Sequence, residues 1–128
     1  MSGDSTETAH PKFRISLRPD GIVYLTWAPG VAIGVEDAVA ATEAIAGLGG
    51  GQRVLALICL GEGSTQDRPA RLEFSRRDDL VTAAALVVRT PALRVMGNLF
   101  VNVNRPKTPI RVFDDEASAI AWLQEFTP

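Results

Sequence analysis

The chain has 128 residues, 46% of them apolar and 22% charged, with a formal net charge of −2 at pH 7. This composition excludes a disordered chain, a collagen-like repeat and a coiled coil, and one cysteine with one histidine excludes an internal disulfide framework and a zinc site built from several such ligands. No apolar stretch approaches the ~20 residues of a membrane span, and the N-terminus lacks the apolar core of a signal peptide. We therefore expect a soluble, cytoplasmic protein. The net charge gives no reason to expect that it binds nucleic acid.

The first part of the chain predicts a polar tail and then a hairpin. Residues 1–12 are rich in Ser, Thr and acids, and we expect them to form a disordered tail ahead of a single domain at 13–128. Residues 13–18 alternate apolar and polar side chains, which is typical of a strand with one buried face. The turn triplet at 19–21 and the β-branched and aromatic run at 22–27 complete an antiparallel β-hairpin.

A helix and a buried strand are predicted next. Apolar residues recur at helical spacing from Val35 to Ile45, and the glycine run Gly47–Gly51 follows. A phosphate-binding loop would follow a strand and be followed by Lys-Ser/Thr; this run follows a helix and leads into a strand, so we interpret it as a helix end. The unbroken apolar run Val54–Leu60 predicts a central strand covered on both faces.

The second half alternates helices and strands. We predict a helix over 68–77, a buried strand over 84–88, and a helix from Thr90 to Val103 that begins with a capping hydroxyl followed by proline. A short strand at 110–113 and a helix over 114–126 complete the chain. The order β-β-α-β-α-β-α-β-α predicts an α/β fold with a mixed, mostly parallel sheet of about five strands and helices packed on the sheet.

Several of these segments carry a family resemblance: Ala84–Val88, Arg94–Phe100, Pro106–Phe113, and Phe113–Ala117 running into Ala121–Leu123. Together with the element order, they resemble the SpoIIAA-like, or STAS-like, fold of anti-sigma-factor antagonists over Phe13–Phe126. The chain is most similar to a bacterial subgroup of small single-domain STAS-like proteins of undetermined function. The resemblance implies a non-catalytic regulatory or protein-interaction module.

The loop after the central strand departs from that family. The antagonists share an Asp-Ser pair there, whose serine is phosphorylated, whereas this chain reads Leu60–Asp67 without such a pair. We therefore expect the phosphoserine switch to be lacking. Glycines and a helix start favour an anion, while Glu62 and Asp67 oppose one, and Asp67 is a natural helix N-cap. The cap-and-loop interpretation is favoured, and the candidate regulatory or anion loop consists of Gly61, Gly63, Ser64, Thr65 and Asp67.

The predicted helix over 90–103 has an unusually wide apolar surface. Residues 68–111 also hold nine of the thirteen basic residues against three acids, a net of +6 that leaves −8 for the rest. A solvated arginine face is favoured, with a basic docking surface as the alternative. Neighbouring helices, a second protein or an apolar ligand must cover the apolar surface, and we expect a homodimer or another protein partner. The candidate partner surface consists of Arg68, Arg71, Arg94, Val95, Leu99 and Phe100.

The sequence offers no credible catalytic set. Cys59 lies in the buried central strand, where a free thiol usually acts as a small hydrophobe, and His10 lies in the tail. We therefore expect no enzyme activity, no metal and no cofactor. The alternative function is binding of a small molecule or lipid, since CRAL-TRIO lipid-binding domains resemble this fold. It requires a cavity lined by residues such as Leu99, Phe100 and Val103.

Overall fold

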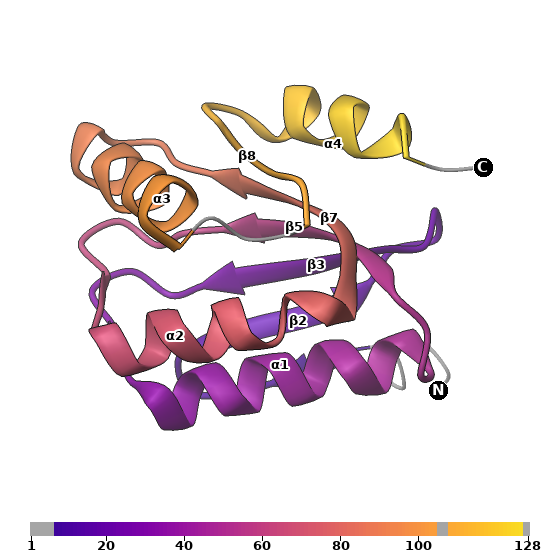
Figure 1. Cartoon of the computed structure of the whole chain (residues 1–128), viewed down its shortest axis with the longest axis horizontal. Helices are drawn as coiled ribbons and strands as arrows, with labels where there is room; N and C mark the ends of the chain where they lie inside the picture. The colour runs from indigo at the N-terminus through magenta and orange to yellow at the C-terminus, as the bar shows by residue number, and fades with distance from the viewer. Residues whose placement is uncertain (1–6, 105–107, 127–128) are drawn as a thin grey trace.

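The computed structural model describes residues 7–104 and 108–126, with side chains at 10–99, 101 and 108–126 (Figure 1). A six-stranded sheet forms the middle of the molecule, in the order β1 (Glu7–Ala9), β2 (Phe13–Leu17), β3 (Ile22–Trp27), β5 (Val54–Cys59), β7 (Val81–Val87) and β8 (Ile110–Phe113). A separate two-stranded sheet pairs β4 (Ala32–Ile33) with β6 (Thr65–Gln66). The helices are α1 (Val35–Gly49), α2 (Arg68–Arg76), the 3₁₀ helix η2 (Asp78–Leu80), α3 (Pro91–Asn104) and α4 (Glu116–Gln124).

The sheet confirms the predicted mixed topology. Strands β2 and β3 are antiparallel around the turn at 18–21, whereas β3, β5, β7 and β8 are parallel neighbours. The apolar run predicted as the central strand is β5, in which Leu57 pairs with Tyr24 on one side and Ala85 on the other. Both Ala56 and Leu57 are fully buried, as expected of a strand that is covered on both faces.

Residues 7–9, which lie within the segment 1–12 predicted as a disordered tail, instead form the edge strand β1. The backbone of residues 7–9 pairs antiparallel with residues 14–16 of β2, which makes six strands where about five were predicted. The three residues show no alternating pattern, and the pairing arises because β2 otherwise presents an open edge of unpaired N–H and C=O groups. Residues 1–6 lie outside the described part of the chain.

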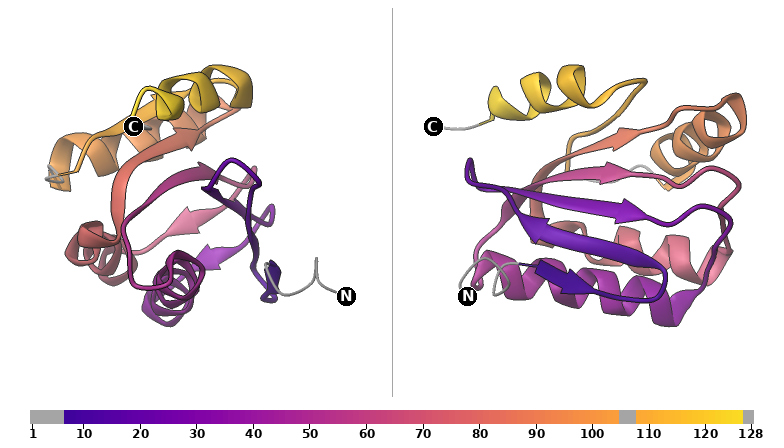
Figure 2. Two further views of the ribbon diagram at one scale, coloured as in Figure 1. Left: turned by 90° about the vertical axis from the view of Figure 1, so that its right-hand side faces the viewer. Right: turned by 180° about the vertical axis from the view of Figure 1, so that it is seen from behind.

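Helices cover both faces of the sheet (Figures 1 and 2). Side chains alternate along β3, so Val23, Leu25 and Trp27 join the core under α1 and α2, while Ile22 joins the core under α4. Helix α3 lies on the α1–α2 side, against β8 and α2. Because β3, β5, β7 and β8 run parallel, their carboxyl ends lie at the same end of the sheet. The loop after β5 lies at this end.

The predicted helix starts carry side-chain caps. The carboxylate of Asp67 accepts a hydrogen bond from the Ala70 backbone N–H at 2.9 Å, and the hydroxyl of Thr90 accepts one from the Leu93 N–H at 3.2 Å. At the end of α1, Gly50 adopts a left-handed conformation with φ of 60°, which confirms that the glycine run ends a helix. In the described part of the chain, no helix is both long and apolar enough to cross a membrane.

Candidate functional site

The loop Gly61–Asp67 is fastened to the segment that follows β3. Gly30 N–H donates to the Glu62 carbonyl at 2.9 Å, and Thr65 N–H donates to the Val31 carbonyl at 2.9 Å as part of the β4–β6 pairing. A Cβ on Gly61 would lie 2.2 Å from the Ala28 carbonyl oxygen, so only glycine fits there. These hydrogen bonds and the close backbone contact hold the loop in one conformation at the start of α2.

The two hydroxyls in this loop differ in their surroundings. Ser64 is 7% exposed, and its hydroxyl donates to the Ala28 carbonyl at 2.9 Å. Thr65 is exposed at the neighbouring position. The first turn of α2 already has a carboxylate acceptor, because Asp67 caps the Ala70 N–H. The geometry matches the cap-and-loop interpretation, and the anion and regulatory roles of Gly61, Gly63, Ser64, Thr65 and Asp67 stay predictions.

Much of the basic charge between residues 68 and 111 is neutralised locally. Arg94 forms an ion pair with Asp114, next to the start of α4. Arginine–carboxylate pairs in this region also include Arg76–Glu73, Arg77–Asp79 and Arg89–Glu116. Arg68 is exposed at the first position of α2, and Arg71 is partly buried one turn later. The basic side is consequently a mixed-charge surface over most of its extent, which favours the solvated-face interpretation.

The apolar surface of α3 is only partly covered by its own domain. Leu93 and Gly97 face inward and are buried, whereas the side chains of Val95 and Leu99 are 67% and 46% exposed. The side chain of Phe100, which the sequence placed on the same surface, lies outside the described side chains. Leu72, on the outward face of the touching helix α2, is also 50% exposed. Large apolar side chains are thus exposed on the outward faces of both α2 and α3.

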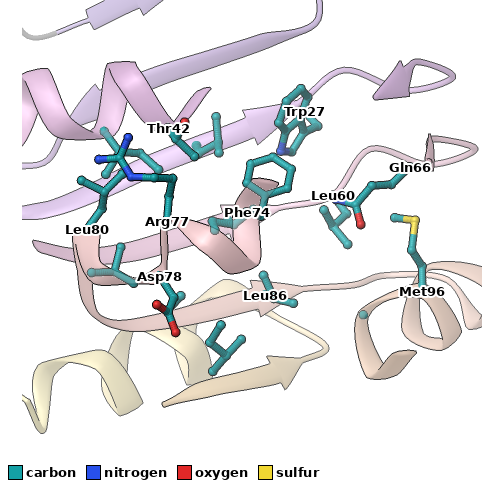
Figure 3. Close-up of a pocket in the computed structure, with 17 residues that line it drawn as sticks. Trp27, Thr42, Leu60, Gln66, Phe74, Arg77, Asp78, Leu80, Leu86 and Met96 are labelled. Atoms are coloured by element: carbon teal, nitrogen blue, oxygen red, sulfur yellow. The ribbon is translucent and has the colours of Figure 1, made fainter. Parts of the chain in front are cut away.

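A cavity of ≈ 90 Å³ lies under these helices, between the sheet and α1, α2 and α3 (Figure 3). Its walls are mostly apolar, including Leu25 and Trp27 from β3, Phe74 from α2 and Met96 from α3. Leu99 does not line it, because that side chain points outward. The small-molecule alternative requires a cavity lined by residues such as Leu99, Phe100 and Val103. The cavity in the structure lies closer to the middle of the sheet, and the side chains of Phe100 and Val103 lie outside the described part.

This cavity is large for a natural core of this size. Protein interiors hold few voids larger than a water molecule, and a void that holds one water has a volume of roughly 10–15 Å³. A concave, mostly apolar pocket with a few polar groups in its lining is the usual form of a small-molecule site.

An open, polar depression of ≈ 340 Å³ lies at the N-terminal ends of α1 and α2. Lys12 Nζ crosses it, donating to the Asp37 carboxylate at 2.7 Å and to the Ala32 carbonyl at 2.8 Å. Burial raises the pKa of Asp37, but the hydrogen bonds from Lys12 and the Gly34 N–H outweigh it and lower the pKa overall. Among the described residues, no three His, Cys, Asp or Glu side chains are grouped to hold a metal ion.

A polar cluster on the opposite face of the sheet was not foreseen from the sequence. Glu116 Oε2 accepts from Tyr24 Oη at 2.9 Å and from the Arg89 guanidinium at 3.0 Å, and the Cys59 thiol lies 3.5 Å away. Burial, followed by the Glu116 charge, raises the pKa of the thiol to about 11. The pKa of Tyr24 rises to about 12, chiefly through burial. Both groups are therefore neutral at pH 7, and the cluster attaches the start of α4 to the sheet.

Comparison with known proteins begins with a family model, described as Domain of unknown function (DUF7793), which matches residues 15–127. No curated protein matches the chain. Among solved structures, an uncharacterised Shewanella loihica PV-4 protein of the DUF3478 family, with a SpoIIAA-like fold, is similar with a TM-score of 0.62 and 12% identity. The match covers 91% of this chain and 98% of that one, and it shows that the fold is SpoIIAA-like, as the sequence predicted.

A second solved structure, a protein of unknown function from Arthrobacter sp. FB24, is 28% identical over 85% of this chain and 90% of that one, with a TM-score of 0.31.

Proposed function

The chain belongs to the family described as Domain of unknown function (DUF7793), and from this premise we propose that it is a cytoplasmic, non-catalytic protein-interaction module. Its contact surface is the outward face of α2 and α3, beside the loop Gly61–Asp67. The observation that carries the proposal is the exposure of large apolar side chains on both of these helices. Of the four large hydrophobic residues exposed in the described part of the chain, Leu72, Val95 and Leu99 lie on these two touching helices.

Single exposed hydrophobic residues are ordinary on protein surfaces, and Val35 at the start of α1 is such a case. Three on adjacent helices suit the apolar centre of an interface. Arg68 at the edge of this surface is exposed, which suits a partner with a carboxylate at the rim of the contact. We therefore propose a protein partner with an apolar centre and acidic margin.

This chain lacks the Asp-Ser pair of the anti-sigma-factor antagonists, and its Ser64 is buried. Both features favour a constitutive contact rather than a phosphorylation switch. A non-catalytic role is also supported by Cys59, because a thiol with a pKa of about 11 is protonated at neutral pH and is a poor nucleophile.

The test is site-specific photo-crosslinking in the organism of origin, with p-benzoylphenylalanine replacing Val95 or, as the matched control, Val35. We expect one defined adduct from position 95 and none from position 35, because both side chains are exposed and only the first lies on the proposed surface. An adduct the mass of two chains would identify the partner as a second copy. Equal adducts from both positions, or none from position 95, would refute the proposal.

A second candidate function, binding of a small molecule, is supported by the cavity between the sheet and α1, α2 and α3.

A further inference from the structure

We infer that this cavity is a binding site for a neutral, mainly apolar small molecule that carries one hydrogen-bonding group. The inference rests on the second candidate function and adds to it the place of the site and the chemical class of its ligand. It does not depend on the protein-interaction surface, whose exposed residues Leu72, Val95 and Leu99 do not line the cavity.

The walls select an apolar occupant. Most of the lining is apolar and includes Leu25, Ile58, Phe74, Ala84 and Leu86, whose side chains offer no hydrogen bond. An apolar void of this kind does not retain ordered water, because each water molecule needs two to four polar partners. Water inside is therefore easily displaced by a molecule that contacts these walls.

The polar side chains in the lining are engaged, with one exception. The Thr42 hydroxyl donates back to the Ala38 carbonyl at 3.0 Å, and the Arg77 guanidinium lies 3.5 Å from the Asp79 carboxylate. By contrast, the side-chain amide of Gln66 makes no hydrogen bond within the described part of the chain, and it stands at the same end of the cavity as Leu60 and Met96 (Figure 3). An uncharged amide calls for a neutral partner such as a hydroxyl or carbonyl.

The size of the cavity limits the ligand. A volume of ≈ 90 Å³ exceeds what one water occupies several times over, and engineered apolar cavities of roughly 150 Å³ take up benzene. Because ≈ 90 Å³ is less than the volume that admits benzene, the occupant is smaller than one ring, about the size of a short alkyl chain. Phe74 and Met96 line the cavity and are both partly exposed, which gives the ligand a way in between α2 and α3.

The test uses Trp27 as a contact reporter, because it lines the cavity and is 3% exposed. The only other tryptophan, Trp122, packs against Phe113 and Phe126 on the opposite face. In a Trp122→Phe variant, 2-bromoethanol should quench the remaining fluorescence saturably, since bromine quenches indole on contact. In the reciprocal Trp27→Phe variant the quenching should be weak and unsaturable.

Two substitutions that fill the cavity locate the binding. Ile58→Phe and Ala84→Leu add volume at lining positions. Each should weaken binding and so raise the half-saturating concentration of the probe by at least about tenfold. The matched control is Leu72→Phe, which adds the same ring on the exposed face of α2 and should leave the curve unchanged. Circular dichroism and thermal unfolding identify any variant that fails to fold, in which case the other filling variant decides.

The amide of Gln66 is tested with a pair of probes that differ in one group. Gln66→Leu should weaken binding of 2-bromoethanol about tenfold and leave binding of bromoethane unaffected. Unsaturable quenching by both probes in Trp122→Phe, or curves that folded filling variants do not change, would overturn the proposed site. If native mass spectrometry of protein from the organism of origin nevertheless finds a bound small molecule, the second candidate function survives while this site does not.

Discussion

Gly61 and Ala28 lie in such close contact that a Cβ on Gly61 would stand 2.2 Å from the Ala28 carbonyl oxygen. The backbone itself forms the obstacle, because the nearest atoms are the carbonyl oxygens and carbon of residues 27 and 28 rather than a flexible side chain. The loop after β5 and the loop after β3 are therefore packed backbone against backbone. This contact fixes the direction in which the chain enters β6 and α2.

Replacing Gly61 with alanine should destabilise the protein by more than about 2 kcal/mol, since two backbone segments must separate to admit a methyl group. The control is Gly47→Ala in α1, where a Cβ meets no atom within 4 Å. That variant should gain about 0.5–1 kcal/mol from helix propensity. Urea unfolding measures both changes, and a Gly61→Ala variant as stable as the native protein would contradict the described packing.

The Cys59 thiol should be unreactive in the folded protein. Its pKa of about 11 leaves it protonated at pH 8, and its 8% exposure limits access. We expect modification by Ellman's reagent at pH 8 to be at least about 100-fold slower in the native than in the urea-unfolded protein, because only rare opening exposes the thiol. Similar rates in the two states would show that the cluster with Tyr24 and Glu116 is open.

The same thiol makes stability depend on alkaline pH. The folded pKa lies above the reference value of 9.0, so between pH 9 and about 11 the unfolded chain loses a proton that the native protein keeps. Stability is therefore fully present below pH 9 and falls as the pH rises through that range. In Cys59→Ala the decline should be smaller between pH 9 and 10, before Tyr24 ionises in the unfolded chain. Parallel curves for the two proteins would contradict the assignment.

Asp37 gives the opposite dependence at acid pH. Its carboxylate accepts hydrogen bonds from Lys12 Nζ at 2.7 Å and from the Gly34 N–H at 2.9 Å, and its pKa lies below the reference value of 3.8. The stabilisation is present above the unfolded pKa and is lost as the pH falls through the folded one. Asp37→Asn should cost about 1 kcal/mol at pH 7, a difference that thermal unfolding should find shrinking below pH 4. A pH-independent difference would assign the cost to the amide rather than to lost charge.

How far the sequence predicts this molecule depends on whether a feature is local. The strand β5 and the start of α3 follow from patterns within a few residues, and the structure confirms both. Strand β1 lacks such a pattern, because its pairing depends on the open edge of β2. The contact between Tyr24 and Glu116 joins residues 92 positions apart, and no spacing rule indicates it.

The cavity belongs to the features that sequence patterns miss. Its walls combine side chains from β3, α2 and α3, so its volume depends on how these elements pack together. An apolar residue that faces a cavity has the same pattern as one that faces a filled core. The sequence therefore indicated that α3 has too much apolar surface, and only the packing shows that Val95 and Leu99 face outward while Met96 lines a void.

The exposure of Leu99 predicts a separation between stability and association. Leu99→Asp should lower the free energy of unfolding by about 1–2 kcal/mol and leave the protein folded, because the side chain is 46% exposed and only its covered part and some helix propensity are lost. Leu93→Asp, at a buried position on the same helix, should unfold the protein. If the partner is a second copy, sedimentation velocity should show weaker self-association for Leu99→Asp than for the surface control Val35→Asp. Unfolding of Leu99→Asp would place that residue in the core.

The final prediction concerns the two hydroxyls of the loop after β5. A phosphate on Ser64 would require breaking its 2.9 Å hydrogen bond to the Ala28 carbonyl and placing close to two negative charges at a position that is 7% exposed. On the exposed Thr65, a phosphate gains from the nearby start of α2 and from Arg68, but the carboxylate of Asp67 already occupies that helix end and repels a second anion. These opposing contributions are similar in size for Thr65, and for Ser64 burial decides against modification.

We therefore expect protein from the organism of origin to have the unmodified intact mass. Ser64→Ala should lower stability by about 1 kcal/mol, because the part-buried Ala28 carbonyl loses its donor, whereas Thr65→Ala should change it by less than about 0.5 kcal/mol. A stoichiometric mass increase of one phosphate that disappears in Thr65→Ala would show a working switch and replace the constitutive contact with a regulated one. The same increase lost only in Ser64→Ala would additionally require the loop to leave the Ala28 carbonyl, which hydrogen exchange at the Thr65 amide would detect as lost protection.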